Sequence, residues 1–180
     1  WRRKNRKNGS MIEKIERYYL EISSKDNFEK KSKPPGSYEF YLNSSDNFEI
    51  NKFFYKQVGK KYQWIDRLTW TNNDWIKYVS NKNLKTYILK QENDFVGFFE
   101  LIFNVEINEC EIAYFGILED YFNKGCGGYM LSKAIEKSFE IGAKRVWVHT
   151  CSLDHPNAIK NYISRGMKIF KTEVLERKAV

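Results

Sequence analysis

The sequence predicts a single α/β domain (of the α+β kind) in which helices flank a mixed, mostly antiparallel central sheet. Hairpin-like strands come first along the chain, and a strand, helix, strand, helix, strand run comes second. The 180 residues are 42% hydrophobic and 17% aromatic, which is enough material for one core. A third observation concerns function: "YFNKGCGGYM" (121–130) places three glycines just where a helical pattern begins.

In the first half of the chain, two short strands are expected to precede two helices. The segment 14–22 is rich in strand-forming residues, the polar segment 23–37 reads as a loop, and 38–42 is expected to be a short strand. A helical stripe of apolar residues covers 50–58. Thr71 then caps a second helix.

The second half carries the remaining elements. Two β-rich runs are separated by three polar residues, 92–94, and therefore form a hairpin. Apolar residues at helical spacing follow the glycines, and Gly142 ends that helix. The expected strands are 84–91, 95–104, 111–118, 145–150 and 167–174, and a further helix covers 155–165.

The positive charge is concentrated at the start of the chain. The net charge is +8, but the first ten residues contain five lysines and arginines and no acid. Because "NGS" precedes Met11, we expect residues 1–10 to be an artificial leader and 11–180 to be the domain. Without the leader the net charge falls to +3. A nucleic-acid partner is therefore not expected.

Cysteine and hydropathy patterns exclude several classes of protein. Three cysteines and two histidines, none at metal-ligand spacing, predict neither a disulfide framework nor a metal site. No apolar run approaches the about 20 residues that span a bilayer. We expect a cytoplasmic protein without a membrane partner.

The glycines lie where a helix would leave unpaired N–H groups. Gly125, Gly127 and Gly128 remove the Cβ atoms that would block an anion from these groups, which favours a phosphate site. A tight strand-to-helix turn is the alternative. Met130 stands where the Walker and dinucleotide patterns need a glycine, so neither pattern applies.

At these residues the sequence resembles the GNAT superfamily of N-acetyltransferases. Gly125-Cys126-Gly127 resembles the acyl-CoA pyrophosphate loop, Q/R-x-x-G-x-G/A, although Phe122 occupies the Q/R place. "AIKNYISRGMKIF" is similar to the family's A-x-x-x-Y-x-x-x-G-F segment, and "RVWVHTCSLDHPNAIKNY" is closest to an uncharacterised bacterial subgroup. The resemblance implies a sheet splayed between its fourth and fifth strands.

The resemblance also implies the activity: an acetyl-CoA-dependent N-acetyltransferase that transfers the acetyl group directly to a primary amine of a small molecule or peptide. A non-catalytic acyl-CoA sensor on the same fold is the alternative, and the chain would be a monomer or homodimer. Residues implied for the cofactor site are Phe115, Ile117, Asn123, Lys124, Gly125, Cys126, Gly127, Gly128, Asn157 and Tyr162. The hydroxyl of Tyr162 would also act on the leaving thiolate.

Acetylation needs a neutral amine, so a general base is expected on the strands beside the split. Glu111 is preferred because it shares strand parity with Phe115, and Glu100 lies on the neighbouring strand. A solvated carboxylate is an equally good interpretation of Glu111. Trp64 and Asp66 are candidates for the acceptor site. Cys151 and His155, four residues apart, have no orienting third group, so covalent catalysis is not expected.

Overall fold

The computed structural model describes residues 5–7 and 10–178, with side chains from Met11 onward. Its strands are β1 (Asn5–Lys7), β2 (Ser10–Ile22), β3 (Tyr38–Leu42), β4 (Leu84–Gln91), β5 (Asp94–Asn104), β6 (Glu109–Ile117), β7 (Arg145–Cys151) and β8 (Lys168–Lys178). Its helices are α1 (Phe48–Tyr62), α2 (Asn72–Val79), α3 (Cys126–Ile141) and α4 (Ala158–Ser164). Residues 1–4 and 8–9 of the expected leader lie outside the description, and the leader stays a prediction.

Most of the expected elements are confirmed. The β4–β5 hairpin closes through Glu92, which takes a left-handed conformation at φ 54°. Thr71 and Asp74 form a capping box at the start of α2. Gly142, at φ 113°, ends α3 as expected. The last helix is shorter than expected and begins at Ala158.

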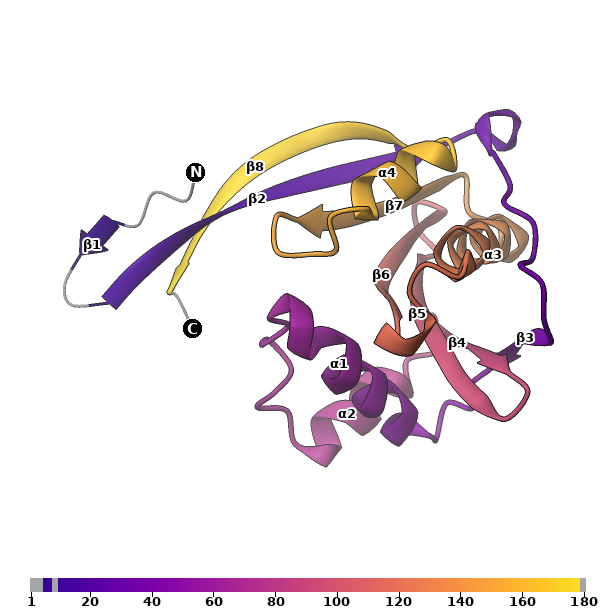
Figure 1. The fold of residues 1–180 in the computed structure, drawn as a ribbon, viewed down its shortest axis with the longest axis horizontal. Coiled ribbons are helices and arrows are strands. Elements are labelled where there is room, and N and C mark those ends of the chain that lie inside the picture. Colours follow the sequence, from indigo (N-terminus) through magenta and orange to yellow (C-terminus); the bar gives the residue numbers. More distant parts are fainter. Residues whose placement is uncertain (1–4, 8–9, 179–180) are drawn as a thin grey trace.

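One sheet holds all eight strands, in the order β1-β2-β7-β6-β5-β4-β3, with β8 on the other edge of β2. Every pair is antiparallel except β6 and β7. This parallel pair is the fourth and fifth strand when counting starts at β3, so the expected mixed sheet is confirmed. Figure 1 shows β2 and β8 as a long, curved ribbon that extends away from the rest of the sheet.

Helices cover both faces of the sheet and build two cores. The larger core contains α3 residues such as Met130 and Leu131, with Phe99 from β5 and Tyr162 from α4. The smaller core places Phe54 of α1 against β4 and β5. Adjacent residues of a strand point to opposite faces, so the α1 side and the α3 side of the sheet are distinct. Helix α2 packs on α1, where Trp75 contacts Tyr55.

Candidate functional site

The sheet opens between β6 and β7. Their pairing covers only three residues of each strand and ends at Glu111 and Trp147, whereas β6 continues to Ile117 and β7 to Cys151. A cavity of about 940 Å³ fills the split and extends past the end of α1. Beyond Glu111, β6 has a strand partner only on its β5 side, so backbone groups that face β7 are available to a ligand.

The glycine loop forms one end of this cavity. Gly125 takes a left-handed conformation at φ 78° and directly precedes α3. A Cβ on Gly127 would meet its nearest neighbours at 3.6 Å, an ordinary contact, so packing does not require glycine there. A Cβ on Gly128 would come within 2.6 Å of Nη1 of Arg165 and 3.0 Å of Cγ of Lys31. The side chains of Arg165 and Lys31 therefore leave no room for a Cβ at Gly128, whereas the N–H groups of the first turn of α3 are suited to an anion.

The expected cofactor-site residues lie together, with one exception. Those that line the cavity are Phe115, Ile117, Asn123, Gly125, Cys126, Gly127, Gly128, Asn157 and Tyr162. Lys124 instead lines a smaller neighbouring cavity of about 430 Å³, beside Asp94 and Asp120. The side chain of Lys124 lies over the ring of Tyr121 at 4.9 Å.

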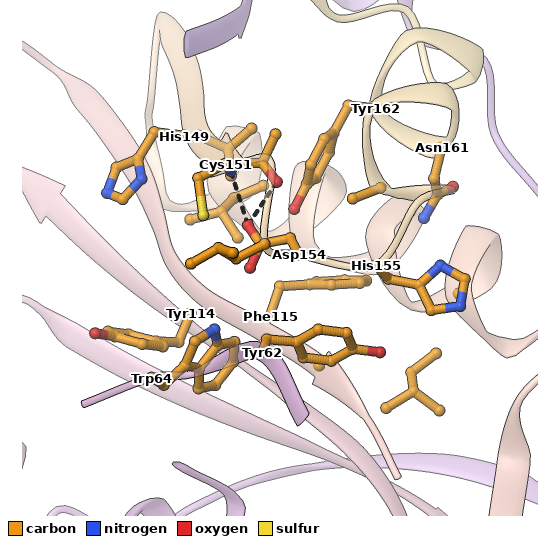
Figure 2. Close-up of a pocket in the computed structure, with 18 of the residues that line it drawn as sticks. Tyr62, Trp64, Tyr114, Phe115, His149, Cys151, Asp154, His155, Asn161 and Tyr162 are labelled. Atoms are coloured by element: carbon orange, nitrogen blue, oxygen red, sulfur yellow. Dashed lines mark hydrogen bonds between the residues drawn. The ribbon is translucent and has the colours of Figure 1, made fainter. Parts of the chain in front are cut away.

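Tyr162 lies in the middle of the cavity wall. Its side chain is buried, and Figure 2 shows its hydroxyl pointing into the cleft. Burial raises the pKa of Tyr162 well above its ordinary value, and the charge of Asp154 raises it further. The hydroxyl therefore stays protonated across the physiological range and is a hydrogen-bond donor.

A β-bulge in β6 corrects the expected orientation of Glu111. Ile112 and Tyr114 pair with consecutive residues of β5, which leaves Ala113 as an extra residue. Ile112 and Phe115 consequently both pack on the α3 side, while Tyr114 packs on the α1 side. Glu111 points to the α1 side, with Tyr114. The expectation that it shares a face with Phe115 is wrong, because parity is lost at the bulge.

Glu111 nevertheless lines the cleft, at the point where the two strands separate. Its side chain is half-buried. Burial raises the pKa of Glu111, and the positive charge of Arg67 partly offsets this effect. A carboxylate with a raised pKa beside the split is suited to accept a proton.

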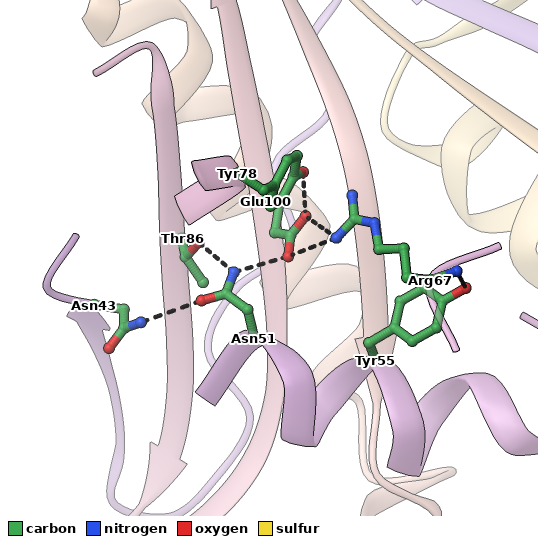
Figure 3. A network of polar contacts seen from close by, with 7 residues as sticks. All are labelled: Asn43, Asn51, Tyr55, Arg67, Tyr78, Thr86 and Glu100. Atoms are coloured by element: carbon green, nitrogen blue, oxygen red, sulfur yellow. Dashed lines mark hydrogen bonds and ion pairs between the residues drawn. The ribbon is translucent and has the colours of Figure 1, made fainter. Parts of the chain in front are cut away.

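Glu100 does not reach the cleft, which corrects the expectation that it acts there. It is completely buried, and its carboxylate accepts hydrogen bonds from Asn51 Nδ2 (2.8 Å) and Tyr78 Oη (2.6 Å). Nη1 of Arg67 lies 3.3 Å from its Oε2 (Figure 3). The Arg67 guanidinium also lies over the ring of Tyr114, at 4.1 Å. Glu100 thus joins α1 and α2 to the sheet. Both of its carboxylate oxygens already have hydrogen-bond partners within the protein.

Trp64 and Asp66 line the cavity beyond the end of α1. Trp64 packs against Tyr114 with ring centroids 4.9 Å apart, as Figure 2 shows. Gly59 provides the room, since a Cβ there would lie 2.6 Å from Cβ of Trp64. These contacts fix an aromatic wall at the end of the cleft that is remote from the glycine loop.

The opposite wall at this end comes from β2 and β8, which the sequence did not indicate as part of a site. Ile15 and Arg17 of β2 and Leu175 and Arg177 of β8 all line the cavity. Arg177 donates hydrogen bonds to the backbone oxygen and to Oε1 of Gln63, the residue that ends α1. The ribbon is thereby attached to the aromatic wall.

Asp154 is a second residue that sequence reasoning missed. It lies in the loop between β7 and α4 and lines the cleft. Its Oδ2 accepts hydrogen bonds from Oγ1 of Thr150 (2.6 Å) and from the backbone N–H of Cys151 (2.9 Å), as Figure 2 shows. An aspartate shortly before a helix start is usually a turn residue, and this common role hides its position in the cleft.

Cys151 and His155 do not form a nucleophile and base. Nδ1 of His155 accepts a hydrogen bond from the backbone N–H of Asn157 at 3.1 Å, and its ring packs on Phe122. Burial raises the pKa of the Cys151 thiol. Among residues 11–178, no three His, Cys, Asp or Glu side chains are grouped to hold a metal ion. None of the described helices is long and apolar enough to cross a membrane.

Comparisons with known proteins identify the family by its model and the fold by solved structures. The model of the acetyltransferase (GNAT) family matches residues 45–167. A GCN5-related N-acetyltransferase from Sphaerobacter thermophilus is 10% identical with a TM-score of 0.70, covering 91% of this chain and 51% of its own. One from Kribbella flavida is 16% identical with a TM-score of 0.63, covering 89% and 56%.

The chain therefore spans about half the length of these two structures. An aminoglycoside acetyltransferase from an uncultured soil metagenomic sample, solved with trehalose, is 13% identical with a TM-score of 0.60, covering 72% of this chain and 87% of its own. At these identities the likeness concerns the fold. No curated protein matches the sequence.

Proposed function

The chain belongs to the acetyltransferase (GNAT) family, and we propose that it transfers the acetyl group of acetyl-CoA directly to a primary amine of a small molecule or peptide. The observation that carries the proposal is the continuity of the cleft. A single cavity joins the glycine loop, the Tyr162 hydroxyl and the aromatic wall at Trp64. An activated acyl donor and an acceptor can therefore meet between β6 and β7.

The glycine loop would hold the pyrophosphate of the cofactor. The first N–H groups of α3 have no partner within the helix, and Gly127, which lines the cavity, has no side chain to keep a phosphate oxygen away from them. Phe115 and Ile117 line the split and would flank the pantetheine arm through their backbone. When bound, acetyl-CoA supplies a thioester, whose acyl carbon an amine can attack.

Backbone and tyrosine groups would stabilise the charge that develops during transfer. Backbone N–H groups of β6 beyond the bulge that face the split can donate to the carbonyl oxygen as it becomes negative. Tyr162 would donate a hydrogen bond to the sulfur. Because burial and Asp154 raise the pKa of Tyr162, it stabilises the departing thiolate as a donor, and solvent completes the protonation.

Glu111 would accept the proton of the acceptor ammonium. A lysine-like amine with a pKa of about 10.4 is almost fully protonated at pH 7, which costs roughly 4–5 kcal/mol. Transfer of one proton to Glu111, directly or through water, frees the nitrogen lone pair. The C–N bond then forms, the C–S bond breaks, and the second nitrogen proton is released as the thiol forms.

An acceptor screen tests the proposal. Free thiol release from acetyl-CoA is followed over amines, polyamines, amino acids and peptides, with mass spectrometry of the products. We expect at least one amine to gain 42 Da in step with the thiol, because one acetyl group replaces one hydrogen. Tight binding of acetyl-CoA without any acetylated product would instead favour the acyl-CoA sensor.

A further inference from the structure

Asp154 directs its carboxylate into the cleft. Hydrogen bonds to one of the two carboxylate oxygens fix the orientation of the group. Both of its hydrogen bonds, from Thr150 and from the Cys151 N–H, go to Oδ2. Thr150 is itself buried, at 2% exposure, so it cannot rotate freely into solvent. Figure 2 shows the other oxygen without a hydrogen bond, directed into the cleft on the side of Phe115, while the Tyr162 hydroxyl lies on the other side of the carboxylate. One oxygen is thus left for a ligand.

The charge of Asp154 acts on the groups at the centre of the cleft. It raises the pKa of Tyr162, and no other carboxylate does so. Burial raises the pKa of Tyr62, which lines the same cavity, and the charge of Asp154 raises it further. Asp154 is therefore a cleft carboxylate whose charge acts on the hydroxyl that the proposed function places at the sulfur.

None of the described cationic side chains forms an ion pair with Asp154. The three arginines of the cavity wall are directed to other carboxylates: Arg67 to Glu100 (3.3 Å), Arg177 to Glu13 (3.7 Å) and Arg17 to Glu173 (4.0 Å). Burial and then Arg17 lower the pKa of His149, so that imidazole is neutral at pH 7.

We propose that Asp154 binds the acceptor as an ammonium ion and holds it in the cleft. This inference rests on the proposed function. It also narrows the acceptor class to alkylamines, which arrive protonated, and disfavours arylamines and alcohols, which arrive neutral. A carboxylate next to an ammonium favours the charged form, so Asp154 binds the acceptor while Glu111 removes its proton. Binding and deprotonation are thus divided between two carboxylates.

The first experiment separates binding from catalysis by steady-state kinetics with the amine found in the screen. Asp154→Asn removes the charge but keeps an oxygen that accepts from Thr150 and Cys151. We expect the KM of the amine to rise about 10- to 100-fold at pH 7, with kcat and the KM of acetyl-CoA within about twofold. The effect should shrink as pH approaches the pKa of the amine. Glu106→Gln, an exposed carboxylate in the β5–β6 turn, serves as the matched control and should behave as wild type.

The second experiment needs no turnover. Cys126 and Cys151 both line the cavity, but Cys126, like Cys110, is buried, whereas Cys151 is partly exposed, so alkylation of Cys151 by iodoacetamide reports on occupancy. We expect 1-aminobutane to slow alkylation of the full chain and 1-butanol, its neutral counterpart, not to. Asp154→Asn should abolish the difference, and Asp154→Glu, which keeps the charge, should retain most of it.

Two results would overturn the inference. One is equal protection of wild-type Cys151 by the amine and the alcohol, which is decisive even if Asp154→Asn fails to fold. The other is a lower kcat with an unchanged KM for the amine, which would make Asp154 the base. If the screen finds no acetylated amine but 1-aminobutane protects Cys151 selectively, the proposed function fails while ammonium binding at Asp154 stands.

Discussion

At the scale of the residue, burial has opposite chemical consequences for the two groups that the proposed mechanism uses. It raises the pKa of Tyr162 and of Glu111 alike. For the tyrosine the shift preserves the proton and hence a donor. For the glutamate it weakens the acid and so strengthens the conjugate base. One low-dielectric cleft thus prepares a donor and an acceptor.

Tyr162→Phe should lower kcat by about 10- to 100-fold, because a hydrogen bond to a developing charge contributes roughly 1.5–3 kcal/mol. The KM of acetyl-CoA should change by less than about twofold, since the lost hydroxyl acts on the leaving thiolate. Single-turnover rates of thiol release measure the effect without interference from product release. If Tyr162→Phe releases thiol at the wild-type single-turnover rate, the role of Tyr162 is limited to packing.

Glu111→Gln should reduce kcat at pH 7 by roughly 100-fold or more. The kcat of the variant should recover partly as the pH is raised toward the pKa of the amine. In the wild type, activity should fall as pH drops through a value above the ordinary glutamate range, because the base must be ionised. A pH–rate profile of both proteins checks this. A variant with the wild-type profile would leave solvent or another group as the base.

The same substitution has a predictable effect on stability. A raised folded-state pKa means that Glu111 favours folding below its unfolded pKa, and this contribution is lost as pH rises through the folded pKa. Glu111→Gln should therefore melt at the same or a higher temperature than wild type at pH 7, with the difference vanishing near pH 4. Thermal melts at the two pH values show whether the carboxylate costs stability.

At the scale of the element, the start of α3 separates two roles of glycine. Gly127→Ala should fold with unchanged or greater stability, because its Cβ has room and alanine favours a helix by up to about 1 kcal/mol. Gly127→Val, whose side chain is larger than the alanine that the family pattern G-x-G/A accepts at this position, should weaken CoA binding about tenfold or more. Calorimetric titration with CoA measures the loss, and normal binding would reduce the loop to a turn.

Gly97→Ala is the matched comparison. A Cβ there would lie 2.6 Å from the backbone oxygen of Gly116, so this variant should lose stability. A Gly127→Ala protein that melts as low as Gly97→Ala would contradict the assignment.

The attachment of α1 and α2 to the sheet depends on a buried charge pair. Glu100→Gln should lower the free energy of unfolding by about 3–5 kcal/mol, because Arg67 would be left uncompensated in an apolar site. Glu100→Gln combined with Arg67→Leu should cost less than the sum of the two single changes. Urea unfolding of the three variants measures this, and additive losses would show that the pair is not coupled.

Local signals predicted elements well and relationships between elements poorly. Thr71 caps the start of α2 and Gly142 the end of α3, each through hydrogen bonds to residues nearby in the sequence. The sequence alone is therefore enough to predict these two helix boundaries. The side to which Glu111 points depends on a bulge that β5 imposes, and the burial of Glu100 depends on helices distant in sequence. Asp154 lies in the loop between β7 and α4, where an aspartate gives no local signal of a site, and only the folded cleft places its second oxygen beside a ligand.

At the scale of the whole molecule, the cleft joins parts of the chain that are far apart, so a ligand that fills it should stabilise the entire fold. At a CoA concentration 100 times its Kd, the gain is about 2.7 kcal/mol. For a chain of this size that corresponds to a rise in Tm of roughly 5–10 °C. Differential scanning fluorimetry with millimolar CoA checks this, and Gly127→Val should show a smaller shift.

The insertion of β2 between β7 and β8 also has a consequence for synthesis on the ribosome. Ile22 leaves the peptidyl transferase centre long before Arg145, where β7 begins, and at about 5–20 residues per second the delay is many seconds. During this time a strand-forming segment has neither of its long neighbours and cannot pair as it does in the native sheet. Closure of the sheet is therefore expected to be a late folding step that cannot precede the synthesis of β7 and β8, and the unpaired segment is exposed to aggregation and to chaperones until then.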